Sequence, residues 1–228
     1  MRVHWSSCPE PEIPVIHLVR HGQASFGTDD YDVLASTGRL QAALAGRELL
    51  RRGVRTPVVA SGSLSRQRDT AAIVSAELGQ PSGNLLVDTR LDEFDAHAMV
   101  AEGLGRQTVE NTMTSAEFQQ HLNEAFIAWI EGQGTSWTAF SLGAVSAIGD
   151  FASSIPKGSD GIVATSAGVT AAIVGVLLGS SAAGIVALNK ASVNASITTV
   201  LSGASGLTLL TYNDHAHLLG HEGMLTMR

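Results

Sequence analysis

The chain has 228 residues, of which 44% are hydrophobic and 15% are charged, and its formal net charge is -7 at pH 7. This length and composition suit one large globular domain with a substantial core and exclude a disordered chain. The acidic balance argues against a nucleic-acid partner, because a polyanion gains nothing from such a surface. A single cysteine, Cys8, excludes an intrachain disulfide and suits the reducing cytoplasm, where we expect the protein to reside.

Two segments bear on targeting and membrane contact. Residues 1–14 contain three prolines and no apolar run of the kind a signal peptide has, so we expect a flexible N-terminal arm followed by a single domain over 15–228. Residues 161–189 carry no charge and are long enough to span a bilayer, but serine, threonine and glycine interrupt them and no basic cluster flanks them. The segment changes character at Ser166, as a buried strand turning into a helix would. No membrane association is therefore expected.

Short apolar runs alternate with amphipathic segments in the first part of the chain. The expected elements are a strand over 15–19, a helix over 40–50, a strand over 56–60, a helix over 65–78 and a strand over 85–87. Strands that alternate with helices predict an α/β fold, namely a three-layer α/β/α sandwich with a mostly parallel sheet.

The segment over about 95–156 breaks this alternation. Apolar residues at helical spacing predict helices over 115–131 and about 142–155, and no strand lies between them. We therefore expect a helical insertion packed beside or above the sheet. The remaining expected elements are a strand over 161–165, a helix that ends at 178, and two strands over 196–202 and 207–212 joined by a hairpin-like turn.

Polar clusters follow three of the predicted strands. Arg-His-Gly at 20–22 follows the first, residues 61–68 follow the second, and Asp-Glu at 92–93 follows the third. In open α/β sheets, ligands bind in the crevice beyond the carboxyl ends of the strands. The three clusters are therefore expected to converge on one site.

These strings together resemble the histidine phosphatase (phosphoglycerate mutase-like) superfamily. Arg-His-Gly alone is a weak signal, but the ordered group is strong. The resemblance spans roughly 16–218 and is weakest in the insertion. The matching strings are Leu18-Val19-Arg20-His21-Gly22, Leu64-Ser65-Arg66 with Thr70-Ala71, Leu91-Asp92-Glu93, and the late segments 194–199 and 212–218.

The resemblance implies that His21 attacks phosphorus and forms a phosphohistidine, while Glu93 protonates the departing oxygen and then helps water attack. Arg20 and Arg66 suit this reaction, because planar guanidinium groups that stay charged can grip the oxygens of a transferred phosphoryl group. Their charges should also lower the pKa of His21 and keep its attacking nitrogen neutral. The alternative for Glu93 is a surface ion pair with Arg90.

Several neighbouring residues have expected roles of their own. Gly22 would let the backbone approach the phosphate closely, and Gln23 and Ser25 would line the substrate entrance. Asp92 is expected to point away from the site. Arg68 is expected to lie on the surface of its helix rather than to assist catalysis.

One position departs from the family pattern. The family has a second catalytic histidine in a string resembling Ser-His-Gly-Gly, and Ser166 stands at its place within 164–168. A hydroxyl can donate one hydrogen bond to a phosphoryl oxygen, so Ser166 is a predicted phosphate ligand, although it supplies no positive charge. Loss of one such donor costs about 10² to 10³ in rate, so activity should survive. His217 would either compensate for the missing histidine or pack locally.

The sequence thus predicts a phosphomonoester hydrolase that acts on a small phosphorylated molecule through His21. A phosphoglycerate-mutase-like phosphotransferase and a weakened binder of phosphate ligands are the alternatives. No cofactor or metal is expected, since the other histidines lack metal-ligand spacing with cysteine or carboxylates. The substrate stays open, and so does the oligomeric state, for which a homodimer is one option. Four residues would either line a substrate pocket or belong to the core: Phe94, His97, Met99 and Trp137.

Overall fold

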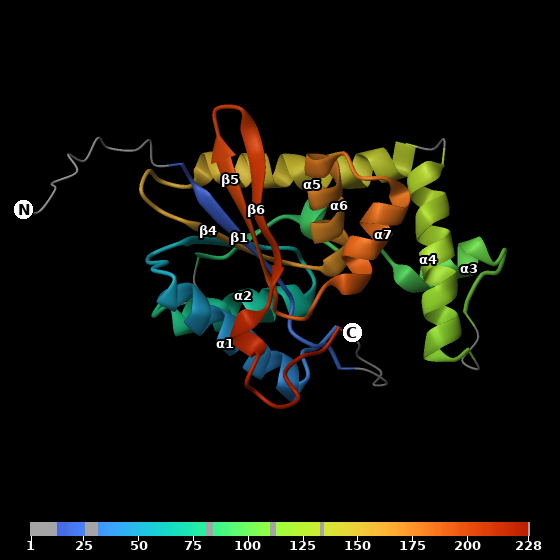
Figure 1. Ribbon diagram of the computed structural model, residues 1–228, viewed down its shortest axis with the longest axis horizontal. Helices are drawn as coiled ribbons and strands as arrows, with labels where there is room; N and C mark the ends of the chain where they lie inside the picture. The colour runs from blue at the N-terminus through green and yellow to red at the C-terminus, as the bar shows by residue number, and fades with distance from the viewer. Residues whose placement is uncertain (1–12, 26–31, 81–83, 110–112, 133–134, 228) are drawn as a thin grey trace, which may run out of the picture.

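The structure is a computed structural model that describes residues 13–25, 32–80, 84–109, 113–132 and 135–227. The predicted N-terminal arm, with Cys8, lies outside these residues except for its last two positions. Within them, a six-stranded sheet in the order β3-β2-β4-β1-β5-β6 forms the centre of the molecule (Figure 1). The strands are β1 (Val15–Arg20), β2 (Val58–Ser61), β3 (Leu86–Val87), β4 (Gly161–Thr165), β5 (Ile197–Gly203) and β6 (Gly206–Asp214).

The direction of the strands confirms a mostly parallel sheet. Strands β3, β2, β4 and β1 run parallel, whereas β5 runs antiparallel to β1. Strands β5 and β6 form an antiparallel hairpin in which Gly203 pairs with Gly206, at the turn that the sequence predicts. The four parallel strands therefore end at one common edge of the sheet.

Helices cover both faces of the sheet and give the predicted three layers (Figure 1). Leu18 of β1 packs in a cluster with Ile148 and Ile173 on one face, while its neighbour Val19 packs with Leu49 on the other. Because β1 is buried on both faces, its sequence is a continuous apolar run rather than an alternating one. The covering helices are α1 (Ser36–Arg51) and α2 (Ser65–Glu77) on one side, and α5 (Thr135–Ser154) and α6 (Ala167–Leu178) on the other.

Among the residues that the structure describes, the region between β3 and β4 contains three α-helices where two were expected. The additional helix is α3 (Ala96–Gly103), and α4 (Ser115–Glu131) has the predicted bounds. Helix α5 begins earlier than expected and packs on the sheet itself, since Ile148 and Phe151 belong to its central cluster. Helix α4 lies beside the sheet, where Phe126 packs against α6 and the next helix, α7 (Ala182–Ala191).

The uncharged segment over 161–189 is divided among β4, α6 and most of α7 (Ala182–Ala191). Gly179 ends α6 in the left-handed region with a φ of 58°, and the hydroxyl of Ser181 accepts a hydrogen bond from the amide of Gly184 at the start of α7. Among the described residues, no helix combines the length and the apolar character that crossing a bilayer requires.

Candidate active site

The carboxyl ends of three parallel strands lie side by side. Arg20 at the end of β1 is in register with Thr165 at the end of β4, and the amide of His21 donates a 2.8 Å hydrogen bond to the Thr165 carbonyl. The amide of Gly62, just beyond β2, donates to the carbonyl of Ala164 on β4. The loops that follow β1, β2 and β4 are therefore held together, and two of these loops belong to the three that the sequence predicts to converge.

His21 lies at the centre of this edge and its ring is buried. Its Nδ1 donates a 2.8 Å hydrogen bond to the carbonyl oxygen of Gly22, and its Nε2 accepts one of 3.3 Å from Nε of Arg66. Burial lowers the pKa of His21 well below its ordinary value, and the charges of Arg20 and Arg66 lower it further. The imidazole is therefore neutral, with its lone pair on Nε2.

Arg66 is positioned by the start of α2. The residue at the N-cap is Leu64, whose side chain has no polar atom, so the first amides of the helix need a partner from elsewhere. Asp32 provides it: Oδ2 accepts from the amide of Ser65 at 2.7 Å, and Oδ1 accepts from the amide of Arg66 at 3.4 Å. Oδ1 also pairs with Nη1 of Arg66 at 2.8 Å. Sequence reasoning missed Asp32, although a leucine at a helix start was a signal that a capping group comes from another segment.

Glu93 faces the same edge from the loop after β3. Its Oε2 accepts a 2.9 Å hydrogen bond from the amide of Gly168 at the start of α6, and its Oε1 accepts one of 3.2 Å from the amide of Phe94. Burial raises the pKa of Glu93 above its ordinary value, against the opposing effects of Gly168 and of the charges of Arg66 and Arg20. The protonated form is therefore favoured relative to an exposed glutamate.

The alternative prediction for Glu93, a surface ion pair with Arg90, is wrong. Arg90 forms ion pairs with Asp88 at 2.6 Å and with Asp150 at 2.8 Å, on the exposed surface. Neighbouring Asp92 turns to Ser63 and accepts hydrogen bonds from its amide and its hydroxyl. Glu93 is thus the carboxylate of this loop whose pKa is affected by the charges of Arg66 and Arg20.

Arg20 is buried beside His21, and its guanidinium donates hydrogen bonds to main-chain carbonyl groups. Its Nη1 donates to the carbonyl of Ser192, and Nη1 and Nη2 each lie 3.4 Å from the carbonyl oxygen of Met227. The C-terminal segment is fixed there because Gln41 donates to the Met224 carbonyl at 2.7 Å. Sequence reasoning missed this contact. The charge of Arg20 nevertheless acts on the pKa of both His21 and Glu93, so the four predicted catalytic residues form one electrostatic cluster.

The loop after His21 packs tightly against α1. A Cβ on Gly22 would lie 2.1 Å from the carbonyl oxygen of Gly38, and the amide of Gly22 donates to the hydroxyl of Thr70. Glycine is thus required here for the approach of the helix, which is a different reason from the predicted approach of a phosphate. The amides of Gln23 and Ser25 donate to Gln41 and to the Val33 carbonyl. The expected contact of Gln23 and Ser25 with substrate stays a prediction.

Ser166 is fully buried at the N-cap of α6. Its hydroxyl oxygen accepts a 2.9 Å hydrogen bond from Nε2 of Gln67, which also donates to the carbonyl of Leu91 at 2.9 Å. Gln67 therefore joins α2 to the loops after β3 and β4, a role that sequence reasoning missed. Contact between Ser166 and a phosphoryl group stays a prediction.

His217 is held in a different environment from His21. Its Nε2 donates a 3.1 Å hydrogen bond to the carbonyl of Ala195. Burial lowers its pKa, and the charged groups that act on it are Glu48, Arg52 and Asp214. Arg20 and Arg66, the arginines that act on His21, are not among those groups. The placement favours local packing over a compensating catalytic role.

The candidate substrate-pocket residues of the insertion lie in an aromatic cluster. Phe94 packs with Phe126 at a centroid distance of 4.9 Å, and Trp137 with Phe126 at 5.8 Å. Met99 packs against the same cluster, whereas His97 is exposed and stacks near Phe118. Phe94, Met99 and Trp137 are partly buried against this cluster, and their contact with a substrate stays a prediction. Arg68 is exposed, as expected.

Within the described residues no group of three or more metal-binding side chains comes together.

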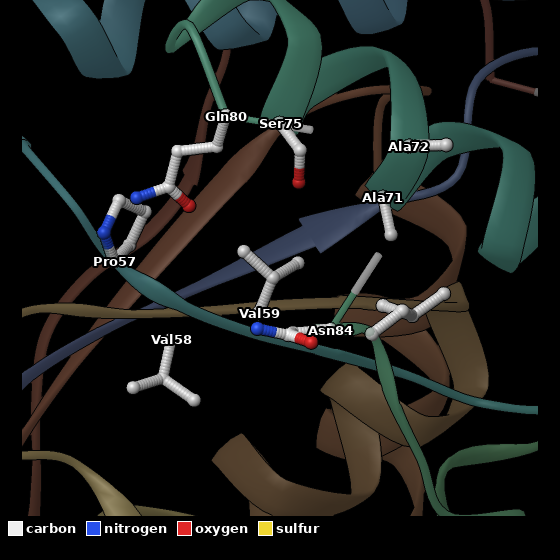
Figure 2. A pocket seen from close by; sticks show the side chains of 9 residues that line it. Pro57, Val58, Val59, Ala71, Ala72, Ser75, Gln80 and Asn84 are labelled. Carbon is white, nitrogen blue, oxygen red and sulfur yellow. The ribbon is translucent and has the colours of Figure 1, made fainter. Parts of the chain in front are cut away.

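A hollow of about 380 Å³ lies between β2 and α2, away from the cluster formed by His21, Arg20, Arg66 and Glu93 (Figure 2). Pro57 and Val58, which line it, lie at the start of β2, whereas the His21 cluster lies beyond the end of that strand. The side chains of Ser75 and Gln80 line its helical side (Figure 2). The hollow is therefore not part of the candidate active site.

Comparisons with known proteins give one family. The family described as the histidine phosphatase superfamily (branch 1) matches residues 16–215. A stretch of 85 residues is 36% identical to the 2,3-bisphosphoglycerate-dependent phosphoglycerate mutase of Methylobacterium sp. (strain 4-46), covering 34% of this chain and 40% of that protein. The chain thus spans about two fifths of the length of the curated relatives it matches.

Solved structures share the fold over nearly the whole chain. The mycobacterial glucosyl-3-phosphoglycerate phosphatase in complex with VO3 is 25% identical, with a TM-score of 0.62 over 89% of this chain and 100% of that one. A mutant phosphoserine phosphatase from Entamoeba histolytica, in complex with phosphoserine, is 15% identical with a TM-score of 0.64 over 90% and 100%. The phosphoglycerate mutase of Bacillus anthracis str. Sterne is 17% identical with a TM-score of 0.61 over 91% and 96%.

Proposed function

The chain belongs to branch 1 of the histidine phosphatase superfamily, and from this premise we propose that it hydrolyses small phosphate monoesters through a phosphohistidine on His21. The observation that carries the proposal is the orientation of the His21 ring. Its Nδ1 is held by the Gly22 carbonyl at 2.8 Å, while Nε2 points its lone pair at the Arg66 guanidinium, 3.3 Å away. A nucleophilic nitrogen beside a fixed cation is what attack on an anionic phosphoryl group requires.

In the first step, the phosphoryl group takes the place of the direct contact between His21 and Arg66. The Nε2 lone pair forms a bond to phosphorus as the bond to the ester oxygen breaks. Arg66 and Arg20 donate hydrogen bonds to the phosphoryl oxygens and stabilise the charge that they carry in transit. Glu93 gives its proton to the departing ester oxygen, so the alcohol leaves neutral.

In the second step, the carboxylate of Glu93 takes a proton from a water molecule that attacks phosphorus. The bond between phosphorus and Nε2 breaks, inorganic phosphate is released, and both His21 and Glu93 return to their starting forms. The low pKa of His21 and the raised pKa of Glu93 support these opposite roles, since the first must be neutral and the second protonated before reaction.

A mutase is the second candidate, because a stretch of 85 residues is 36% identical to a phosphoglycerate mutase. In that reaction the phosphoryl group on His21 returns to a hydroxyl of the substrate instead of passing to water. Incubation with 3-phosphoglycerate and a catalytic trace of 2,3-bisphosphoglycerate separates the two. Net release of inorganic phosphate supports the hydrolase, and conversion of 3-phosphoglycerate to 2-phosphoglycerate without release of inorganic phosphate supports the mutase.

Turnover of p-nitrophenyl phosphate tests the proposed site. We expect release of p-nitrophenol by the wild type and its loss in His21→Ala. His121→Ala is the matched control, because His121 lies on α4 beside Glu124, 3.6 Å away, and it should keep wild-type turnover. Equal turnover in wild type and His21→Ala would refute the proposal. Binding of inorganic phosphate without any wild-type turnover would identify a weakened phosphate binder.

A further inference from the structure

We propose that Asp32 is a positioning residue for the reaction proposed above, because its carboxylate fixes the Arg66 guanidinium so that Nε faces Nε2 of His21. The inference rests on the proposed function for its catalytic meaning. It goes beyond the family strings found in the sequence, which contain Arg66 and His21 but not Asp32.

The geometry joins two functions in one carboxylate. Oδ2 of Asp32 accepts from the amide of Ser65 at 2.7 Å, and Oδ1 accepts from the amide of Arg66 at 3.4 Å. These are the first two amides of α2, which Leu64 at the N-cap cannot satisfy. Oδ1 also takes a 2.8 Å hydrogen bond from Nη1 of Arg66. The same group therefore fixes both the start of the helix and the end of the side chain that the helix presents.

The contact between Asp32 and Nη1 of Arg66 also sets the direction in which Nε of the guanidinium points. With Nη1 held on Asp32, Nε donates to Nε2 of His21 at 3.3 Å. The Arg66 side chain is 11% exposed and that of Asp32 33%, so the pair is shielded from water more than a surface ion pair. On charge alone, a carboxylate beside an anion-binding arginine would weaken phosphate binding. Its presence here is explained by orientation.

Three variants separate orientation from helix capping. Asp32→Asn keeps an oxygen that can accept from the Ser65 amide, since Asn and Asp are comparable N-caps, but it loses the ion pair with Arg66. Asp32→Ala loses both. Asp69→Asn is the matched control, because Asp69 lies on the same helix and forms an exposed 2.8 Å ion pair with Arg39.

We expect kcat/KM for p-nitrophenyl phosphate to fall by about tenfold to a hundredfold in Asp32→Asn, as a misplaced catalytic group does. Its Tm should stay close to that of the wild type, whereas Asp32→Ala should lose both activity and Tm. Asp69→Asn should keep wild-type kcat/KM. Wild-type kcat/KM in Asp32→Asn, together with a lowered Tm in Asp32→Ala, would make Asp32 a helix cap only and overturn the proposal.

Titration of the His21 imidazole by NMR gives a readout that does not need turnover. Arg66 lowers the pKa of His21, so a guanidinium released by Asp32→Asn should let that pKa rise. If Asp32 acted only through its negative charge, its removal would instead lower the pKa of His21. A fall or no change overturns the inference. If the wild type shows no turnover, the proposed function fails, and this titration alone decides the role of Asp32.

Discussion

The backbone amide of Gly168 donates a 2.9 Å hydrogen bond to Oε2 of Glu93. Because this amide belongs to the first turn of α6, the positive end of the helix dipole faces the carboxyl group. A Cβ at position 168 would lie 2.3 Å from Oε1 of Glu93 and 2.3 Å from the ring of Phe94. The glycine therefore allows the loop after β3 to approach α6 and fixes where the proposed acid lies.

Gly168→Ala should displace Glu93 and lower activity. We expect kcat for p-nitrophenyl phosphate to fall by up to about a hundredfold, and the added methyl group to cost about 1–3 kcal/mol of stability. The control is Gly143→Ala in α5, where nothing lies within 4 Å of the added Cβ. It should keep activity and be neutral or slightly stabilising, because alanine is the better helix former. Equal kcat values and equal thermal stability for the two variants would contradict this assignment.

The pH dependence of kcat/KM should report on Glu93. The first step needs its protonated form, and burial raises its pKa above the ordinary value of 4.5. Activity should therefore fall on the alkaline side, as pH rises through that raised pKa, while His21 stays neutral far below 6.5. Glu93→Gln should remove this decline and lower kcat/KM by about 10² to 10⁴.

The control for Glu93 is its neighbour. Asp92→Asn replaces a carboxylate that is bound to Ser63, so it should keep the alkaline decline. A second comparison uses the leaving group: Glu93→Gln should affect an alkyl phosphate more than p-nitrophenyl phosphate, whose phenolate leaves readily without a proton. An unchanged pH profile in Glu93→Gln would exclude Glu93 as the acid.

Ser166 and Gln67 should behave as a coupled pair. Both are fully buried and share a 2.9 Å hydrogen bond, so an imidazole at position 166 has no room while Gln67 is present. Ser166→His alone should lose about 1–3 kcal/mol of stability. The double variant Ser166→His with Gln67→Ala should relieve this overpacking, although it loses the hydrogen bonds of Gln67. It should exceed wild-type turnover, by at most about 10²-fold. Turnover no higher than that of the wild type would mean that position 166 does not correspond to the family's second histidine.

His17 should make the protein less stable in mild acid. It is buried in β1 against the hydroxyl of Thr199, and burial, with a smaller effect of Arg52, lowers its pKa from 6.5 to about 4. An unfolded chain binds the proton below pH 6.5, whereas the folded chain does so only near pH 4. Stability is therefore full above pH 6.5 and is lost as pH falls through this window.

The size of the His17 effect can be measured by denaturant unfolding at pH 7.5 and pH 5. His17 should account for about 2 kcal/mol of the loss between these pH values. His17→Val, which suits a buried strand, should reduce the loss by that amount, whatever its effect on absolute stability. The same loss in the variant and the wild type would show that His17 is not held neutral by the fold.

The parts of the fold that could be predicted from the sequence are those that local patterns of apolar and polar residues determine. Continuous apolar runs gave β1 and β4, and the polar strings after them gave His21 and its partners, because parallel strands bring their ends together. Helix α7 was missed because its residues continue the uncharged run of α6, although Gly179 and Ser181 mark the end of one helix and the start of the next.

The supporting contacts could not be read from local patterns. Asp32 reaches α2 from the segment before α1, and Met227 reaches Arg20 across 207 residues of sequence. Such contacts depend on how the loops fold over the sheet edge. The spacing of apolar residues in the sequence does not predict the conformation of these loops. Likewise, the sequence identifies Gln67 only as a polar residue in a predicted helix. Its role in joining α2 to the neighbouring loops depends on its hydrogen bond to the buried hydroxyl of Ser166.

Rapid quenching of the enzyme during turnover tests the covalent role of His21 most directly. Mass spectrometry of the quenched, digested protein should find one phosphoryl group on the peptide that contains His21, stable in base and labile in acid. The modified peptide should be absent before substrate is added and absent from His21→Ala. Turnover without any phosphorylated His21, or a phosphoryl group on another residue, would contradict the mechanism.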